Sequence, residues 1–290
     1  MSLLDIATPA FRARFGRAPF LVHHRLAAHR LFALPRLVEL ARALPAASVE
    51  WNAGKVPISL DPAHTPRNGL SPEETIRRIE ECSSWLVLKN VERDPEYAEL
   101  LKRCLAQVGA LDPRITAGMH GEESFIFISS PNAVTPYHMD PEENFLLQIR
   151  GRKTMRIFER AVLSAKELER FHNGAHRNLA YREEYAARAR AYNLMPGLGV
   201  HVPVTAPHWV QNGPEVSVSF SITFRTAASA RAAHAHQLNS WLRRIGIEPA
   251  PVGQSVLRDR LKELVLKIRR ARPLAAPSVL PSAQAAIQAA

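Results

Sequence analysis

From Glu123 onward the sequence changes to a period of two, and this pattern restricts the fold more than any other feature of the chain. Short segments with the composition of β-strands follow one another, with turn residues between them. They cover residues 124–128, 134–140, 144–150, 153–158, 199–203, 209–211 and 216–225. Many short strands of this kind are typical of a jelly roll made of two sheets. The sequence therefore predicts a mainly β fold, a double-stranded β-helix over residues 123–226, with flanking helices.

Two turns are expected to pair neighbouring strands. Gly151 is predicted to fold the segment from Lys153 back beside residues 144–150, and Asn212-Gly213 is the strongest short hairpin signal in the chain. The strand that follows alternates between an apolar face, residues 216, 218, 220, 222 and 224, and a hydroxyl face, residues 217, 219, 221 and 223. The hydroxyl face either meets solvent or turns into the mouth of the barrel.

The remaining segments are predicted to be mostly helical. Residues 1–122 form a helical and mixed region that packs on the barrel, with a helical pattern over residues 19–45 and helices that begin at Ser71 and Asp94. A helical insertion capped by Ser164 covers residues 164–193. Helices follow over residues 227–272, and the Ala- and Pro-rich tail, residues 273–290, is expected to be disordered.

The C-terminal helices carry an apolar stripe beyond the predicted barrel. In its second part the stripe consists of Val256, Leu257, Leu261, Leu264, Val265 and Ile268. Such a stripe needs a packing partner. It either covers the barrel or pairs with its copy in a homodimer.

A His-x-Asp pair lies inside the second predicted strand. His138 and Asp140 are two residues apart, so both side chains project from one face of an extended strand. With a second imidazole, for which His208 is the candidate, they would form a 2-His-1-carboxylate site for Fe(II). Twelve histidines make such pairs common by chance, and His120-Gly121-Glu122 is another. The pair at His138 is distinguished by the nearby Thr135, Asn144 and Lys153.

Together these residues resemble the core of the JmjC and cupin-like Fe(II)/2-oxoglutarate oxygenases, and most of all the branch with the asparaginyl hydroxylase of the hypoxia response. The pattern T-P-x-H-x-D begins at Thr135, Asn144 follows, and Q-x-x-G-x-K ends at Lys153. The second half has Pro196-Gly197, Val202-Pro203 and His208. The match covers about residues 125–224; Leu198-Gly199 stands where an acidic residue is common.

The resemblance implies a role for each matching residue. His138, Asp140 and His208 would bind Fe(II), which leaves positions for 2-oxoglutarate and dioxygen. Lys153 and Thr135 would hold the far carboxylate of 2-oxoglutarate, with Arg225 as the rival anchor. Asn144 and Ser221 would orient the ligands or the bound cosubstrate. His201, Tyr137 and Trp209 are interpreted as packing or pocket wall. The expected reaction hydroxylates a protein or peptide side chain, or a small molecule, and releases succinate and CO2.

Three other functions stay open at this point. The chain could be a non-catalytic cupin-fold regulator or sensor, an N-demethylase that uses the same site, or an isomerase-like cupin with Mn or Zn. The intact ligand set argues against the sensor, and no further His or Glu ligand can be placed near the stretch for the isomerase. The sequence does not identify the substrate; we expect residues 57–68 and 164–193 to determine specificity.

The composition limits the location and the partners. The net charge is +11, which favours an acidic partner, although an Arg-, Ala- and Pro-rich composition is also a mark of a GC-rich genome. Nucleic-acid binding is therefore not favoured. The two cysteines, Cys82 and Cys104, cannot form a disulfide framework and indicate a reducing compartment. No signal peptide or membrane span is recognisable, so we expect a cytoplasmic protein.

Overall fold

The computed structural model describes residues 2–61 and 64–271. Contacts divide the chain into two compact units, residues 1–230 and residues 231–290, each of which is treated by itself. The predicted disordered tail, residues 273–290, lies outside the described residues. No helix in the described part of the chain is long and apolar enough to cross a membrane.

The first unit contains two antiparallel sheets, which confirms the predicted double-stranded β-helix. The large sheet has the order β1-β2-β10-β7-β12-β5-β4-β3 and the small sheet the order β6-β11-β8-β9. The large sheet consists of β1 (Leu4–Asp5), β2 (Phe20–His24), β10 (Leu198–Val202), β7 (Glu143–Arg150), β12 (Ser217–Arg225), β5 (His120–Ser129), β4 (Ser84–Lys89) and β3 (Val49–Ala53). The small sheet consists of β6 (Val134–His138), β11 (His208–Asn212), β8 (Lys153–Phe158) and β9 (Ala189–Leu194).

Both predicted hairpins are wrong, because consecutive strands switch sheets at these turns. β7 and β8, which flank Gly151, belong to different sheets, and so do β11 and β12, which flank Asn212-Gly213. Gly151 has φ +67°, and a Cβ there would lie 2.4 Å from the carbonyl oxygen of Val216. The turn therefore needs glycine because one sheet-crossing connection passes close to the other.

The two faces of β12 lie in different environments. Its apolar residues join the main core of the unit, where Phe220, Ile222 and Phe224 are fully buried. Its hydroxyl residues are buried as well, and Ser219 and Ser221 bond to side chains of β7. The solvent-exposed interpretation of this face is wrong: it faces the interior between the two sheets.

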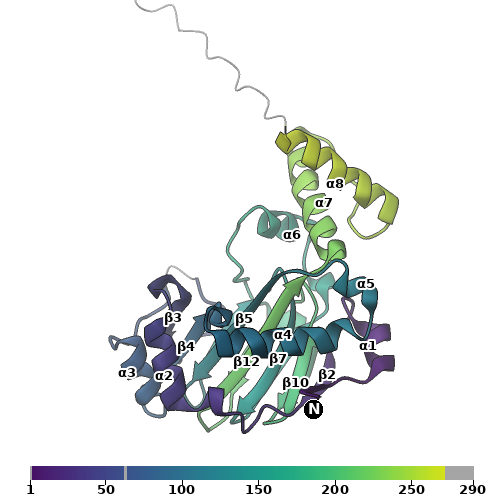
Figure 1. Cartoon of the computed structure of the whole chain (residues 1–290). Coiled ribbons are helices and arrows are strands. Elements are labelled where there is room, and N and C mark those ends of the chain that lie inside the picture. Colours follow the sequence, from purple (N-terminus) through teal and green to yellow (C-terminus); the bar gives the residue numbers. More distant parts are fainter. Residues whose placement is uncertain (1, 62–63, 272–290) are drawn as a thin grey trace, which may run out of the picture. The chain divides into compact units, whose positions relative to one another are not determined.

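Helices cover the outer face of the large sheet, and α4 crosses in front of it (Figure 1). They are α1 (Thr8–Arg14), α2 (Leu34–Ala43), α3 (Pro72–Arg77), α4 (Pro95–Gly109) and α5 (Pro113–Thr116). The predicted starts are confirmed: Ser71 Oγ accepts from Glu74 N, and Asp94 accepts from Glu96 N. Buried side chains of these helices and of the outer face of the sheet form one hydrophobic cluster.

Two helical predictions are wrong in part. Residues 20–24 form strand β2, which pairs with β1 and β10. Within the helix predicted over residues 19–45, only α2 and a short 3-10 turn are helical. Of residues 164–193, only α6 (Ala165–His172) is an α-helix, with the predicted Ser164 cap; a 3-10 segment (Glu183–Arg188) and β9 follow. Sheet pairing outweighs the helix propensity of these Ala-, Leu- and Arg-rich segments.

The C-terminal helices are α7 (Ala227–Arg244), which extends across the boundary between the units, and α8 (Val256–Ala271). The stripe predicted on α8 is exposed: Leu257 is 79% and Leu261 60% accessible, whereas Leu266 is buried. A homodimer formed through this stripe stays a prediction.

Candidate metal centre

Two imidazoles meet on adjacent strands of the small sheet. His138 ends β6, His208 begins β11, and the two residues are direct antiparallel partners. Their ring centroids lie 4.1 Å apart, and both side chains are buried. The pairing of β6 with β11 thus brings together two histidines that are 70 positions apart in the sequence.

Backbone carbonyls fix the tautomer of each ring. His138 Nδ1 lies 2.7 Å from the oxygen of Pro136, and His208 Nδ1 lies 2.9 Å from the oxygen of Ala206. A carbonyl only accepts, so each Nδ1 carries the hydrogen and donates it. Burial lowers the pKa of both imidazoles, so both rings are neutral at pH 7, with a free lone pair on Nε2. This is the form that binds a metal ion.

Asp140 completes the group just beyond the end of β6. Its Oδ2 lies 3.9 Å from His138 Nε2 and 3.6 Å from His208 Nε2. Burial opposes ionisation of the carboxyl group. The two imidazoles, in the protonated form that they take up at acidic pH, and the Arg177 guanidinium outweigh burial, so the pKa of Asp140 is lowered. One ligand atom from each of the three residues lies within 4.8 Å of the other two. Two neutral nitrogens and one carboxylate oxygen are the donor set of a 2-His-1-carboxylate site.

A lysine without a partner faces the same interior. Lys153 begins β8, pairs in register with Asn212 of β11, and is 6% exposed. Among residues 2–61 and 64–271, no carboxylate or hydrogen-bond acceptor contacts its Nζ. Burial alone lowers the pKa of Lys153 to about 7. A buried ammonium without a counter-ion is costly, so this position suits an anionic ligand.

Polar side chains of the large sheet face the interior from the other side. Ser221 Oγ donates to Asn144 Oδ1 at 2.7 Å, and Ser219 Oγ donates to Gln148 Oε1 at 2.6 Å. Asn144 and Ser221, both predicted site residues, are therefore in contact with each other. Thr135 lies on β6 and lines a cleft together with His138.

Several other candidates lie away from this group. Arg225, the rival anchor, is half exposed and forms an ion pair with Glu142 at 2.8 Å. His201 points to the outer side of the large sheet, where its Nε2 lies 2.8 Å from Glu143 Oε2 and its ring stacks on Phe20. Tyr137 and Trp209 pack in an apolar cluster with Phe158. His120 is exposed on β5.

Arg177 is a site residue that the sequence did not indicate. Its Nη1 lies 3.4 Å from Asp140 Oδ1, the oxygen that faces away from the imidazoles. Its backbone carbonyl accepts from Met139 N at 3.2 Å, so its segment runs beside the end of β6. Asp140 and Arg177 are 37 residues apart, and no spacing pattern could have joined them before the path of the insertion was known.

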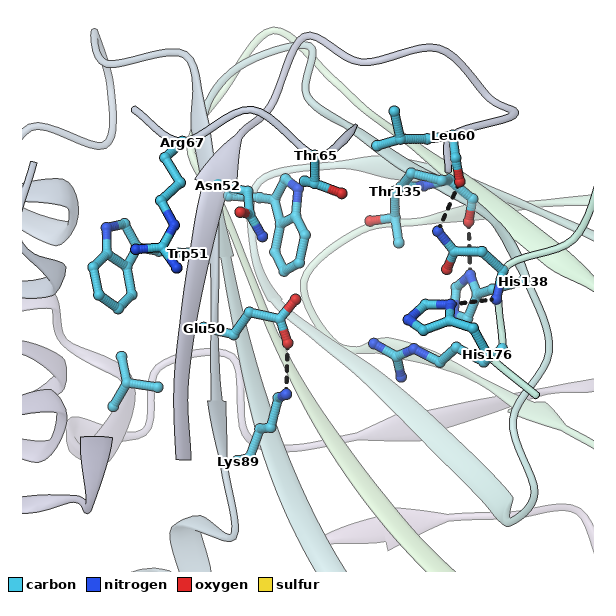
Figure 2. A pocket seen from close by; sticks show the side chains of 15 residues that line it. Glu50, Trp51, Asn52, Leu60, Thr65, Arg67, Lys89, Thr135, His138 and His176 are labelled. Carbon is cyan, nitrogen blue, oxygen red and sulfur yellow. Dashed lines mark hydrogen bonds and ion pairs between the residues drawn. The ribbon is translucent and has the colours of Figure 1, made fainter. Parts of the chain in front are cut away.

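The two segments expected to determine specificity both lie at the edge of β6 that does not pair with β11. Tyr137 N donates to the carbonyl of Ile58 at 2.8 Å, and Leu179 N donates to the carbonyl of Tyr137 at 2.9 Å. Between these segments and the β3–β4 end of the large sheet lies a cleft of about 560 Å³. Figure 2 shows Glu50 and Asn52 on one side of it and Thr135, His138 and His176 on the other.

Comparison with known proteins supports the fold. No family model matches the sequence. The chain is similar in structure to YcfD of Escherichia coli, with a TM-score of 0.56 and 16% identity over 95% of this chain and 70% of that one. A second YcfD structure, described as a ribosomal oxygenase in complex with cobalt and 2-oxoglutarate, matches with a TM-score of 0.50 and 17% identity over 93% of this chain and 68% of that one. At this identity the likeness establishes a shared fold.

Proposed function

We propose that this chain is an Fe(II)- and 2-oxoglutarate-dependent oxygenase that hydroxylates a side chain of a protein or peptide, or a small molecule, with release of succinate and CO2. The observation that carries the proposal is that the small sheet holds both a candidate metal site and a buried lysine. The His138, Asp140 and His208 group and the unpartnered ammonium of Lys153 all come from β6, β11, β8 and the residues just after β6. A metal site alone fits many enzymes, whereas a metal site beside a buried cation suits a metal that is chelated by an anionic cosubstrate.

The chain's own groups have distinct tasks in this function. His138 and His208 would bind iron through Nε2, with Nδ1 kept on backbone carbonyls, and Asp140 would bind through Oδ2. Bound iron with 2-oxoglutarate would supply the activation of dioxygen and the oxidation of a C–H bond. Lys153 would form an ion pair with the far carboxylate of the cosubstrate, and Thr135 would donate a hydroxyl hydrogen bond. Ser221 holds the Asn144 amide, which would orient the bound cosubstrate.

The related structures add support for this type of chemistry. The structure of YcfD with cobalt and 2-oxoglutarate is of a ribosomal oxygenase. By analogy, a protein substrate is favoured over a small molecule. The similarity to YcfD does not support the asparaginyl hydroxylase branch, so the resemblance to that branch rests on the sequence motif alone.

The test is to load the protein with Fe(II) and 2-oxoglutarate without oxygen and record the weak visible charge-transfer band of the chelate. We expect the band in the wild type and in His120→Ala, which changes the rival His-x-acid pair on the surface. We expect no band in His208→Ala, because two ligands bind iron far more weakly than three. A wild type without the band, or a band that survives His208→Ala, contradicts the proposal. Succinate release with candidate peptides then separates an oxygenase from a sensor.

A further inference from the structure

The cleft that leads to His138 passes over the free edge of the large sheet. β3 is the last strand of this sheet and pairs with β4. Val49, Glu50, Trp51 and Asn52 all line the cleft, although alternate residues of a strand point to opposite faces. Figure 2 shows Glu50 and Asn52 pointing to one side of β3 and Trp51 to the other. The cleft therefore includes the edge of β3 itself.

The main-chain groups of Trp51 on this edge are open, whereas the N–H of Ala53 is occupied. The N–H of Ala53 points away from β4 and donates to the carbonyl of Pro66 at 2.8 Å. In an antiparallel ladder every second residue directs its N–H and C=O to the same side. The N–H and C=O of Trp51 therefore also point away from β4, and no described residue pairs with them. An extended polypeptide can bind such an edge as an added strand.

The charges of the cleft favour an acidic occupant. Its ionised side chains are those of Glu50, Arg67, Lys89 and Arg177. Glu50 and Lys89 compensate each other, with Oε2 and Nζ 2.5 Å apart. In the loaded centre proposed above, the positive charges of the divalent metal and Lys153 would equal the negative charges of Asp140 and 2-oxoglutarate. The positive charge of Arg177 would then have no net counter-charge. Arg67 has no ion-pair partner among the described residues.

Arg67 is held at the edge of β3 by its neighbours. Pro66 accepts from Ala53 N, and the Asn68 side chain donates to Thr75 Oγ1 at 2.9 Å and to Ser84 Oγ at 2.8 Å. The backbone is thus fixed on both sides of Arg67, while its side chain stays exposed. A guanidinium on a fixed backbone binds a carboxylate with a smaller loss of conformational entropy than one on a mobile loop.

His176 adds a neutral donor on the opposite wall. Its Nδ1 accepts from Asn178 N at 3.0 Å, and burial, together with the adjacent Arg177, lowers its pKa. With Nδ1 occupied as an acceptor, the hydrogen of the neutral ring is on Nε2. A second donor thus adds to the preference for acceptor groups in the occupant.

We propose that the cleft binds an extended, acidic segment of polypeptide as an added strand on β3, with an Asp or Glu side chain on Arg67. The oxidised residue would then lie further along the segment, toward His138. The inference depends on the proposed function for the chemistry at the metal, but the binding of the segment does not require turnover.

The experiment selects peptides by binding. The full chain, loaded with Mn(II) and an unreactive dicarboxylate analogue of 2-oxoglutarate, is immobilised and exposed to a library of random decapeptides, and the bound members are sequenced. We expect enrichment of Asp and Glu by about five-fold at one position, the scale of a single exposed ion pair. We also expect depletion of proline at a fixed distance from that position, because proline cannot donate to the Trp51 carbonyl.

Matched variants assign the effect to its residue. Arg67→Gln should remove the acidic enrichment, and Arg67→Glu should shift it to Lys and Arg. Arg103→Gln, the same change on an exposed part of α4, should leave the selection as in the wild type. Selection without charge preference, acidic enrichment that survives Arg67→Gln, or unrestricted proline overturns the proposal, as does displacement of every bound peptide by a single-stranded oligonucleotide. Since binding is measured without catalysis, an absent charge-transfer band with intact selection would reject the proposed function alone.

Discussion

One carboxylate oxygen of Asp140 faces Arg177, and the other faces the imidazoles. Oδ1 lies 3.4 Å from the Arg177 guanidinium, and Oδ2 lies 3.6 Å from His208 Nε2. The guanidinium thereby selects one rotational state of the carboxylate. Two effects of opposite sign follow for a bound divalent ion. Orientation of a ligand is worth about ten- to hundred-fold in metal affinity, whereas repulsion by a half-exposed cation costs on the order of 1 kcal/mol or less.

We therefore expect Arg177→Met to weaken Mn(II) binding by about ten-fold, because the loss of orientation exceeds the relief of repulsion. Titration of the free Mn(II) signal by electron paramagnetic resonance measures this affinity. Arg182→Met is the matched control, since Arg182 is an exposed arginine of the same insertion that pairs with Glu184. Tighter binding by Arg177→Met would mean that charge, not orientation, is the main effect of this residue.

Lys153→Met should stabilise the ligand-free protein and weaken cosubstrate binding. A buried amine without a partner costs about 1–3 kcal/mol, which methionine avoids at similar volume. The same change would remove the proposed ion pair to 2-oxoglutarate, worth about 1.5–3 kcal/mol, or roughly ten- to hundred-fold in affinity. Denaturant unfolding and calorimetric titration of the Mn(II)-loaded protein with 2-oxoglutarate measure the two changes. Lys166→Met, an exposed lysine on α6, should change neither, and a destabilised Lys153→Met would show that the amine has a partner.

The pH dependence should have opposite signs for stability and for binding. The pKa of Lys153 falls from 10.5 to about 7 on folding, so between these values the unfolded chain holds a proton that the folded chain has lost. Stability of the ligand-free protein should thus rise from pH 7 toward pH 10.5, relative to Lys153→Met. Affinity for 2-oxoglutarate should fall over the same range, because the amine must take up a proton to bind the carboxylate. Parallel pH profiles in wild type and variant would contradict this assignment.

A comparison of two serine variants on β12 can distinguish a hydrogen bond that only stabilises the fold from one that also supports ligand binding. Ser219→Ala and Ser221→Ala each remove one buried hydrogen bond, to Gln148 and to Asn144, and each should cost about 1 kcal/mol of unfolding free energy. We expect Ser221→Ala alone to weaken 2-oxoglutarate binding, by several-fold, because Asn144 then loses its fixed orientation. Equal affinities in the two variants would place Asn144 outside the cosubstrate site.

The sequence predicted the fold class and the three residues, His138, Asp140 and His208, that lie together. The His-x-Asp spacing indicated His138 and Asp140, although β6 ends at His138 and Asp140 follows it. The role of Lys153 stays a prediction. Helix starts at Ser71 and Asp94 were also indicated by local spacing, since a cap and a following proline act within one turn.

Predictions that depended on tertiary pairing were less successful. Gly151 and Asn212-Gly213 have the composition of hairpin turns, yet the strands beside them enter different sheets. A turn signal specifies a change of direction and not the partner of the next strand. β9 and Arg177 were missed for the same reason: each is defined by what it lies against, and their Ala- and Arg-rich surroundings favour a helix when considered alone.

The candidate site and the main hydrophobic cluster lie in different parts of the two-sheet structure. All three metal-ligand candidates and Lys153 come from the smaller sheet and the residues just after β6, whereas the main hydrophobic cluster lies on the far side of the larger one. Substitutions in that cluster should change how long the molecule survives heating without altering the spacing among the reactive groups. Thermal tolerance and the geometry of the candidate site can thus be varied separately, which makes the helical side of this scaffold the place to begin engineering it.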